Sequence, residues 1–334
     1  MIRSRARTLV VLVVSFGLFA AACGEDTSGT KTNGNTKPGS ELSGSITVDG
    51  SSTVGPLASA AAELFRTENP DVLITVGTSG TGGGFKKFCA GETDMSDASR
   101  PIKTDDEGEG PACDANGIKY TELQVANDGI ALVTNKENTW AECMTVDQLK
   151  KIWEPAAEGT VTNWNQVDAS FPDQELTLFG AGTSSGTFDF FTKEINGEEK
   201  ASRTDYNATE DDNVTVQGVE GDKGALGYFG LSYYEQNKDK LAVVAVDGGS
   251  GCVAPTTETV QDGTYAPLSR PLFVYPSAEL VARPEGLAFV EYFIDNSAEI
   301  AVQALFVPMT AEQLTAAKDA VSALVGSASS TATP

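Results

Sequence analysis

The stretch SITVDGSSTVGPLASAAAELFRTENPDVLITVGTSGTGGGFKKFCAGE, residues 45–92, decides the fold. Short β-branched runs alternate in it with amphipathic runs that have helical periodicity. Such alternation is typical of α/β proteins whose strands are mostly parallel. We therefore predict an α/β fold. The same reading predicts later strands at 124–135, 175–180, 225–229, 241–246 and 271–275, and later helices at 146–153, 187–195, 284–294 and 311–324.

Two extended segments, ELQVANDGIALV (122–133) and RPLFVYP (270–276), indicate crossings between two lobes. The chain is also long for one doubly wound sheet. We expect the first lobe to combine residues 45–125 with 269–326, and the second to be residues 126–268. A single domain is the alternative.

The N-terminal leader has the features of an export signal. Arg3, Arg5 and Arg7 precede an apolar run, residues 9–22, that ends at Cys23, and no acidic residue lies before that cysteine. The run is too short to cross a bilayer as a helix. We expect residues 1–22 to be removed and Cys23 to be acylated, with ordinary cleavage nearby as the alternative.

The segment after the leader is rich in Gly, Ser, Thr and Asn and has almost nothing to bury. Such a composition does not offset the entropy cost of folding. We expect residues 23–44 to be a lipid-anchored flexible tether and residues 327–334 to be a loose tail. The protein is thus expected outside the cytoplasm, held at the cell membrane by its lipid or free in a periplasm.

Four cysteines remain after Cys23, and an even number in an exported chain predicts two disulfides. Three pairings are possible. We favour Cys89 with Cys113 and Cys143 with Cys252, because each pair then stays inside one lobe. A metal site is disfavoured because the chain has no CxxC pair and no histidine. We expect no cofactor.

The charge is strongly negative, −24 for the chain and −27 once the three arginines of the leader are removed. A nucleic-acid partner is therefore not expected. The same charge opposes the capture of an anion, so an anion site here must depend on local dipoles and hydrogen bonds.

Three times, a predicted strand runs into a cluster of glycine and hydroxyl residues that opens a helix. Each cluster offers unpaired backbone N–H groups at the positive end of a helix dipole, where anions bind. Helix capping alone is the alternative for any one cluster. Because ligands bind beyond the carboxyl ends of strands in open α/β sheets, we expect all three at one site. They are residues 50–55, 80–84 and 182–187.

Two of these clusters imitate enzyme motifs. Residues 182–186 match GxSxG, the nucleophile elbow of serine hydrolases, but without histidine the usual triad cannot form. A lysine-assisted hydrolase or phosphatase using Ser184 or Ser185 stays as an alternative. GTSGTGGGFKK (77–87) lacks the GxxxxGK[ST] spacing of a nucleotide-binding loop.

Asp97, in TDMSDASRPI (93–102), follows the second cluster. A carboxylate opposes most anions, but phosphate near neutral pH still has a proton to donate, whereas sulfate has none. A buried acceptor would therefore select phosphate over sulfate. The alternative is that Asp97 caps a turn.

At these residues the sequence resembles the phosphate-binding proteins of bacterial phosphate-specific ABC transporters. The resemblance covers essentially the whole mature chain. It includes DGSSTVGPL (49–57), GTSGTGGGFKKF (77–88), residues 97–101, SSGTFDFF (184–191), SRTDYNATEDDNVTVQGV (202–219), GDKGALGYFG (221–230) and PLSRPLFVY (267–275).

The resemblance implies a type II periplasmic-binding-protein fold, two lobes joined by extended strands, and a dehydrated phosphate site without covalent chemistry. It implies that Asp97 accepts the phosphate proton and that the partner is an ABC importer with its permease subunits. The donors it implies are Ser52, Thr53 and the Val54 N–H from the first cluster, Thr81 and Gly82 from the second, and Ser185, Gly186 and Thr187 from the third.

One position departs from the better-known members, which have an arginine four residues before the serine of the third cluster. Here that position is Ala181. We predict that Arg203, or else Arg100, supplies the charged contact, because a guanidinium offers forked donors to phosphate; an ion pair elsewhere is the alternative for each. The rival functions are binding of sulfate, molybdate or phosphonate, the hydrolase above, and a surface adhesion or signalling lipoprotein.

Overall fold

The computed structural model describes residues 42–106 and 108–330. The expected signal peptide, the acylated Cys23, nearly all of the expected tether and the last four residues of the expected tail lie outside these residues. Within them, no helix combines the length and apolar character that a membrane span requires.

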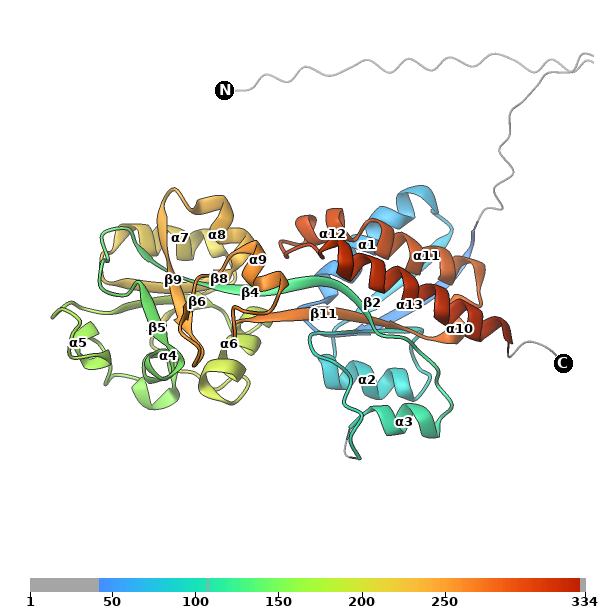
Figure 1. Cartoon of the computed structure of the whole chain (residues 1–334), viewed down its shortest axis with the longest axis horizontal. Helices are drawn as coiled ribbons and strands as arrows, with labels where there is room; N and C mark the ends of the chain where they lie inside the picture. Colours follow the sequence, from blue (N-terminus) through green and yellow to red (C-terminus); the bar gives the residue numbers. More distant parts are fainter. Residues whose placement is uncertain (1–41, 107, 331–334) are drawn as a thin grey trace, which may run out of the picture. The chain divides into compact units, whose positions relative to one another are not determined.

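The described part of the chain is a mixed α/β structure built on one 11-stranded sheet. Its central strand order is β2-β1-β3-β11-β4-β8-β6-β7, and the apolar side chains form separate cores at the two ends of that order. The predicted α/β fold is confirmed. Figure 1 shows the two groups of elements, which we call lobe 1 and lobe 2, and the strands β4 and β11 that run between them.

Lobe 1 has a three-stranded parallel unit, in which β1 pairs with both β2 and β3. Helices α1, α11 and α13 lie on one side of the strands and α2 and α3 on the other (Figure 1). The elements are β1 (Gly44–Gly50), α1 (Gly55–Glu68), β2 (Val72–Gly77), α2 (Thr81–Cys89), β3 (Met95–Ala98), α3 (Gly110–Ala115), β11 (Ser269–Pro276), α10 (Ala278–Val281), α11 (Pro284–Asp295), α12 (Ser297–Gln303) and α13 (Ala311–Ser330).

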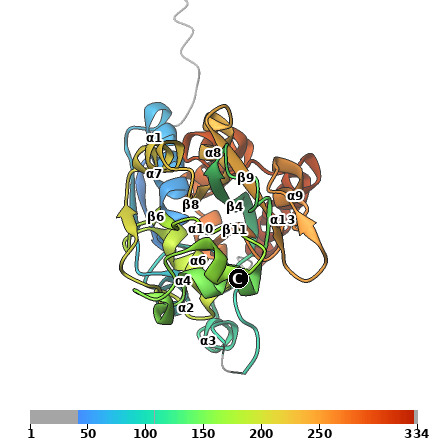
Figure 2. The same ribbon diagram turned by 90° about the vertical axis from the view of Figure 1, so that its left-hand side faces the viewer.

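Lobe 2 has helices α7 and α8 on one side of its strands and α4 and α6 on the other, as Figure 2 also shows. Its elements are β5 (Cys143–Thr145), α4 (Val146–Trp153), a 3-10 turn (Pro155–Ala157), α5 (Trp164–Val167), β6 (Thr177–Ala181), α6 (Gly186–Asn196), β7 (Asn207–Thr209), α7 (Asp212–Gly221), β8 (Ala225–Gly230), α8 (Leu231–Asn237), β9 (Leu241–Asp247), β10 (Cys252–Val253) and α9 (Thr257–Gln261).

Helix α4 illustrates how local sequence fixes an element. Thr145 accepts a hydrogen bond from the Gln148 backbone while the Gln148 side chain accepts one from the Thr145 backbone, which is a capping box. Leu149, Ile152 and Trp153 recur at helical spacing and are fully buried. Burying each such side chain stabilises the fold by about 1.5–3 kcal/mol.

Strand β4 (Leu123–Asn135) is buried along almost its whole length. Its apolar run at residues 130–133 is preceded by two buried polar residues, Asn127 and Asp128. It pairs antiparallel with β11, β8 and β9, while the sequence predicted mostly parallel strands. That prediction is corrected: the crossing segments run in opposite directions and therefore pair antiparallel with each other.

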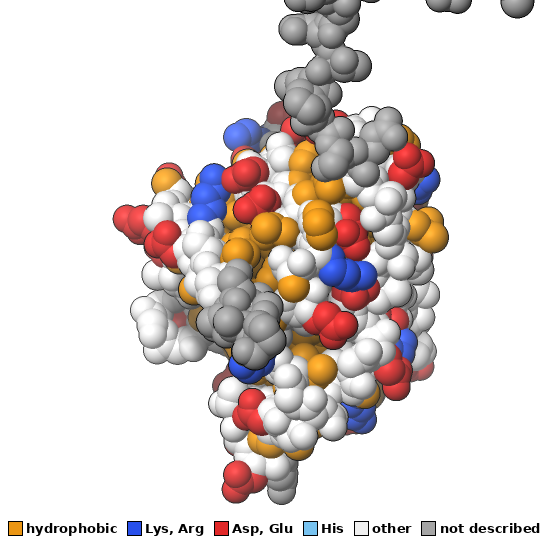
Figure 3. All heavy atoms as spheres, turned by 90° about the vertical axis from the view of Figure 1, so that its right-hand side faces the viewer, with side chains coloured by type: hydrophobic (Ala, Val, Ile, Leu, Met, Phe, Trp, Pro, Cys, Tyr) orange, Lys and Arg blue, Asp and Glu red, His pale blue; other side chains and the backbone are white. Residues whose placement is uncertain are grey.

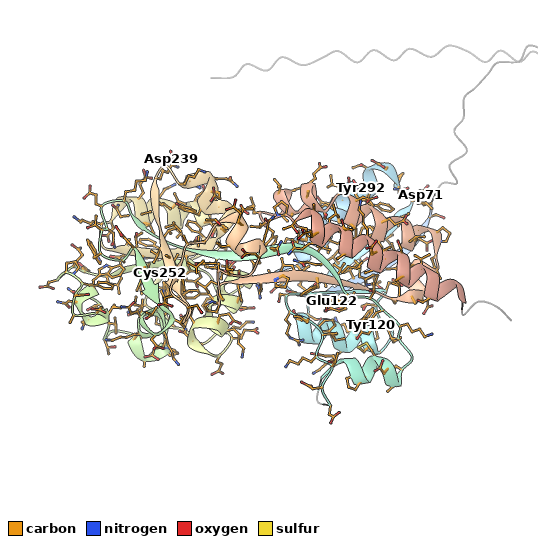
Figure 4. All side chains as sticks on the ribbon, viewed as in Figure 1. Asp71, Tyr120, Glu122, Asp239, Cys252 and Tyr292 are labelled. Carbon is orange, nitrogen blue, oxygen red and sulfur yellow. A yellow bond between two sulfur atoms is a disulfide. The ribbon has the colours of Figure 1, made fainter. Side chains whose placement is uncertain are left out.

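Both disulfides of the structure have the pairing that the sequence favoured. Cys89 bonds Cys113, which joins α2 to α3. Cys143 bonds Cys252, which joins β5 to β10 in lobe 2 across 109 residues (Figure 4). Each disulfide therefore ties together elements of a single lobe.

Candidate functional site

The first helix start lies between β1 and α1. The Ser51 hydroxyl oxygen accepts a hydrogen bond from the Thr53 N–H at 3.2 Å, and the Ser51 carbonyl accepts one from Gly55 N–H at 2.8 Å. No side chain caps α1, and Pro56 occupies its first turn. This end of α1 is therefore open to a ligand that accepts hydrogen bonds.

Hydrogen bonds to the Asp49 side chain hold the second helix start, between β2 and α2, in place. The Asp49 carboxylate accepts hydrogen bonds from the Ser79 hydroxyl, from the Ser79 N–H at 3.1 Å and from the Lys87 ammonium at 2.7 Å. Gly80 then turns the chain with a φ of 79°, which favours glycine. Burial raises the pKa of Asp49, but the hydrogen bonds from Lys87 and Ser79 outweigh burial and lower that pKa below its ordinary value. The carboxylate is therefore ionised and holds the loop in place.

The third helix start, between β6 and α6, meets the first across the pocket. Ser185 caps α6 by accepting a hydrogen bond from the Thr187 N–H at 3.1 Å. A Cβ added to Gly186 would lie 2.3 Å from the Thr53 hydroxyl oxygen. Only glycine at 186 lets the two starts approach this closely.

One cavity of about 650 Å³ collects residues from all three helix starts and from both lobes. Ordinary capping explains one cluster at a time, but it does not explain three clusters meeting at one cavity. The predicted residues that line it are Ser52, Thr53, Thr81, Gly82, Arg100 and Gly186.

Four other predicted residues lie beside this cavity without being part of its lining. Val54 is fully buried at the start of α1, and Ser185 and Thr187 flank Gly186 at the start of α6. Asp97 lies on β3, where its carbonyl accepts a hydrogen bond from the Ser51 N–H at 3.1 Å.

Asp97 is fully buried, and neither of its carboxylate oxygens makes a hydrogen bond to a described residue. A Cβ on Gly50 would lie 2.5 Å from one of these oxygens, so glycine at 50 makes room for the carboxylate. Burial raises the pKa of Asp97 to about 8; the nearby Ser51 N–H offsets part of this rise, and the charge of Asp49 adds to it. Asp97 is therefore a buried carboxyl without a side-chain hydrogen-bond partner among the described residues, and below about pH 8 it keeps its proton in the phosphate-free protein.

Arg203 lies away from the cavity, and its predicted contact with the ligand is corrected. It is 4% exposed and donates to both carboxylate oxygens of Asp205, at 2.5 and 2.8 Å, and to the carbonyls of Ile152 and Val161. These hydrogen bonds lower the pKa of Asp205 to about 2. A buried guanidinium needs such partners, and Arg203 therefore braces the core of lobe 2.

Arg100 does line the cavity, but its guanidinium is already bound. It donates to both carboxylate oxygens of Glu109, at 2.5 and 3.3 Å, and to the Pro101 carbonyl at 3.0 Å. Its charged end also lies 5.5 Å from the centre of the Phe85 ring. The sequence therefore placed Arg100 near the site without revealing this partner.

The structure brings into the cavity one arginine that the sequence analysis did not name as a site residue, Arg270 on β11. It donates to Asp128 on β4 and to the Thr53 hydroxyl, and it stacks on Phe190 of α6. A sequence signal existed: Arg270 and Asp128 are charged residues inside the two apolar segments predicted to cross between the lobes, and such positions line a cleft.

The electrostatic setting is otherwise negative. Figure 3 shows acidic side chains spread over the face that it draws, in keeping with the net charge of −24. Long-range attraction therefore does not bring an anion to the cavity, and the local N–H and hydroxyl donors must hold it. No group of side chains within residues 42–106 and 108–330 is suited to hold a metal ion.

Fold and site together define a two-lobed binding protein whose cavity is built from donors to an oxyanion. The chain matches the family described as the PBP superfamily domain over residues 35–297. It is 46% identical over 274 residues to Protein SphX of Synechocystis sp., covering 82% of this chain and 81% of that protein. It is 40% identical over 287 residues to the phosphate-binding protein PstS of Staphylococcus saprophyticus, covering 85% and 86%.

A solved structure is similar as well. The crystal structure of a possible phosphate binding protein from Planctomyces limnophilus superposes with a TM-score of 0.80 at 44% identity, covering 85% of this chain and 99% of that one. The chain therefore belongs to the PBP superfamily, in the family of phosphate-binding proteins that the sequence resembles.

Proposed function

We propose that this protein binds inorganic phosphate outside the cytoplasm and delivers it to an ABC importer. The observation that supports this most is the meeting of three donor-rich helix starts at one cavity, beside the unpaired carboxyl of Asp97. The names of the relatives agree, since PstS of S. saprophyticus is a phosphate-binding protein.

The proposed donors come from each helix start in turn. Ser52 and Thr53 offer hydroxyls and Val54 its N–H from the first, and Thr81 and Gly82 contribute from the second. The third is the start of α6, with Ser185, Gly186 and Thr187. Hydroxyl and N–H donors of this kind replace the water around an oxyanion when it is buried.

Asp97 gives the proposed site its selectivity. We propose that Asp97 releases its proton to solvent as phosphate binds, and that the phosphate hydroxyl then donates a hydrogen bond to this carboxylate, which otherwise lacks a partner. Sulfate brings no proton at neutral pH, and its charge would lie against the carboxylate. A site with a buried acceptor therefore disfavours sulfate by leaving that acceptor unpaired.

We further propose that lobe 1 consists of residues 45–125 and 269–326 and lobe 2 of residues 126–268. The separate apolar cores support this division. Phosphate would enter between the lobes and be buried as they close, and the closed form would be the one that the permease subunits accept. Acylation of Cys23 would hold the protein at the membrane through a flexible tether.

A hydrolase that uses Ser184 or Ser185 is the enzymatic alternative, and we propose that no covalent chemistry occurs. Ser185 caps α6, and the backbone of Ser184 donates to Glu210. Neither serine hydroxyl has a hydrogen bond to a lysine among the described residues. A nucleophilic serine needs a base within hydrogen-bond reach.

Isothermal calorimetry with phosphate, sulfate and molybdate on the purified protein tests the proposal. Binding of phosphate with rejection of sulfate from pH 6 to 8 is expected. Equal affinity for sulfate, or no binding of phosphate, would refute it. Turnover of a chromogenic phosphate ester that is abolished by Ser184→Ala would instead support the hydrolase.

A further inference from the structure

We propose that Arg270, on the crossing strand β11, is the charged partner of the bound anion. This inference rests on the proposed function, because it assigns a residue to the same phosphate site. It places the positive charge on a strand that joins the lobes, instead of on the loop before α6, where Ala181 stands.

The guanidinium of Arg270 is aimed by its neighbours. Arg270 faces Asp128 in the register of β11 and β4. The Asp128 carboxylate accepts a hydrogen bond from Nε at 3.1 Å and forms an ion pair with Nη2 at 3.0 Å. The Phe190 ring lies beneath it, with 3.7 Å between the guanidinium carbon and the ring centre. Both contacts hold the guanidinium in one orientation before any ligand binds.

Asp128 leaves donors of Arg270 available for a ligand. Nη2 also donates to the Thr53 hydroxyl at 3.0 Å, and Thr53 belongs to the first helix start. Nη1 makes no hydrogen bond to a described residue, although Arg270 is part of the cavity lining. An oxyanion at the first helix start would therefore find a free guanidinium nitrogen beside the Thr53 hydroxyl.

The other basic side chains of the cavity are less suited to this role. Glu109 binds both terminal nitrogens of Arg100. Lys193 lies on the exposed side of α6, and its ammonium is 3.5 Å from the Gly197 carbonyl. Among the cations that line the cavity in the described residues, Arg270 is the one that donates a hydrogen bond to a side chain of a helix start.

Carboxylates from two elements balance this partly buried charge. Asp128 bonds Arg270 from β4, and Asp189 and Glu194 act on it from α6 through their charge. A guanidinium is costly to bury alone, and these acids explain how it stays in place without a ligand. Phosphate then has to take up only the donors that Asp128 leaves free.

The place of Arg270 has a mechanical consequence. Its side chain touches Thr53 in lobe 1 and Phe190 in lobe 2, while its backbone is part of a strand that runs between them (Figure 1). An anion bound to Arg270 and to the helix starts would thus link both lobes to the crossing strand.

Calorimetry on Arg270→Gln, with Arg203→Gln as the matched control, tests the assignment. Both variants remove a guanidinium paired with an aspartate, but only Arg270 lies at the cavity. Loss of a charge-assisted hydrogen bond predicts phosphate binding about 10- to 100-fold weaker in Arg270→Gln and within threefold of wild type in Arg203→Gln. Wild-type affinity in Arg270→Gln would overturn the inference.

A crystal structure of the wild-type protein with phosphate covers the case in which Arg270→Gln does not fold. The inference predicts a guanidinium nitrogen of Arg270 within about 3.2 Å of a phosphate oxygen. A bound phosphate that contacts another arginine, or none, would refute the role of Arg270 and leave phosphate binding intact. Failure of the wild type to bind phosphate would instead refute the proposed function.

Discussion

Replacement of Asp97 by asparagine should change how the stability of the phosphate-free protein depends on pH. Asp97 is fully buried, its carboxylate oxygens lack hydrogen bonds to described residues, and its pKa is raised to about 8. Asparagine has nearly the same shape and does not titrate, so Asp97→Asn removes the ionisation and keeps the packing.

The sign follows from the direction of the shift. A carboxyl whose pKa is raised on folding favours the folded state in its protonated form. The contribution of Asp97 is therefore fully present below its unfolded pKa of 3.8 and is lost as the pH rises towards about 8. Between these values the loss is about 1.4 kcal/mol for each pH unit.

Urea unfolding of the phosphate-free wild type and of Asp97→Asn at pH 5, 6 and 7 measures this loss. The free energy of unfolding of the variant, minus that of the wild type, should rise by about 1.4 kcal/mol per pH unit. The amide group adds its own burial cost, but that cost is the same at each pH. A difference that stays constant from pH 5 to 7 would show that Asp97 is not the buried acid described here.

The same variant tests the role of Asp97 towards the ligand. A hydrogen bond to a charged group is worth about 1.5–3 kcal/mol, so phosphate should bind about 10- to 150-fold more weakly to Asp97→Asn. Discrimination against sulfate should fall as well. Asp212→Asn is the matched control, because burial raises the pKa of Asp212 to about 6 but it lies outside the cavity lining. Unchanged selectivity in Asp97→Asn would remove Asp97 from the site.

Three further changes test the scaffold. Gly186→Ala places a methyl group 2.3 Å from the Thr53 hydroxyl oxygen. Calorimetry should therefore give phosphate binding at least about 10-fold weaker. Wild-type affinity would mean that the two helix starts need not approach so closely. Asp49→Asn should weaken phosphate binding several-fold and speed amide hydrogen exchange in the loop before α2. An unchanged exchange rate would mean that the hydrogen bonds of Asp49 do not hold this loop. Replacing Cys143 and Cys252 by serine should cost about 2–5 kcal/mol in urea unfolding, because their disulfide closes 109 residues.

Much of the scaffold could be predicted from local sequence. Helix α4 has the predicted bounds, residues 146–153, because its capping box and its apolar spacing lie within a few residues of each other. The helix starts were predictable for the same reason, since glycine and hydroxyl clusters act on the adjacent backbone. The antiparallel pairing of the crossing strands was missed, because strand direction depends on how distant segments meet.

The charged partner could not be predicted in the same way. Arg203 is buried and Arg270 is partly buried, and each pairs with an aspartate. The apolar segment around Arg270 indicates a crossing strand, but it does not say that the guanidinium faces a cavity. Arg203 finds its carboxylate two positions along the chain, whereas Arg270 finds Asp128 on a strand 142 residues earlier. Only tertiary pairing decides which of the two guanidinium groups faces the cavity.

The charges around the cavity explain how an acidic protein can hold an anion there. Asp49 is paired with Lys87, Glu109 with Arg100, and Asp128 with Arg270. Asp97 differs, because it is fully buried and both its oxygens lack partners among the described residues. A ligand that brings a proton satisfies Asp97, and a ligand without one leaves it unpaired at a cost of about 1–3 kcal/mol. Selectivity would thus come from the unpaired carboxyl of Asp97 and not from the overall charge.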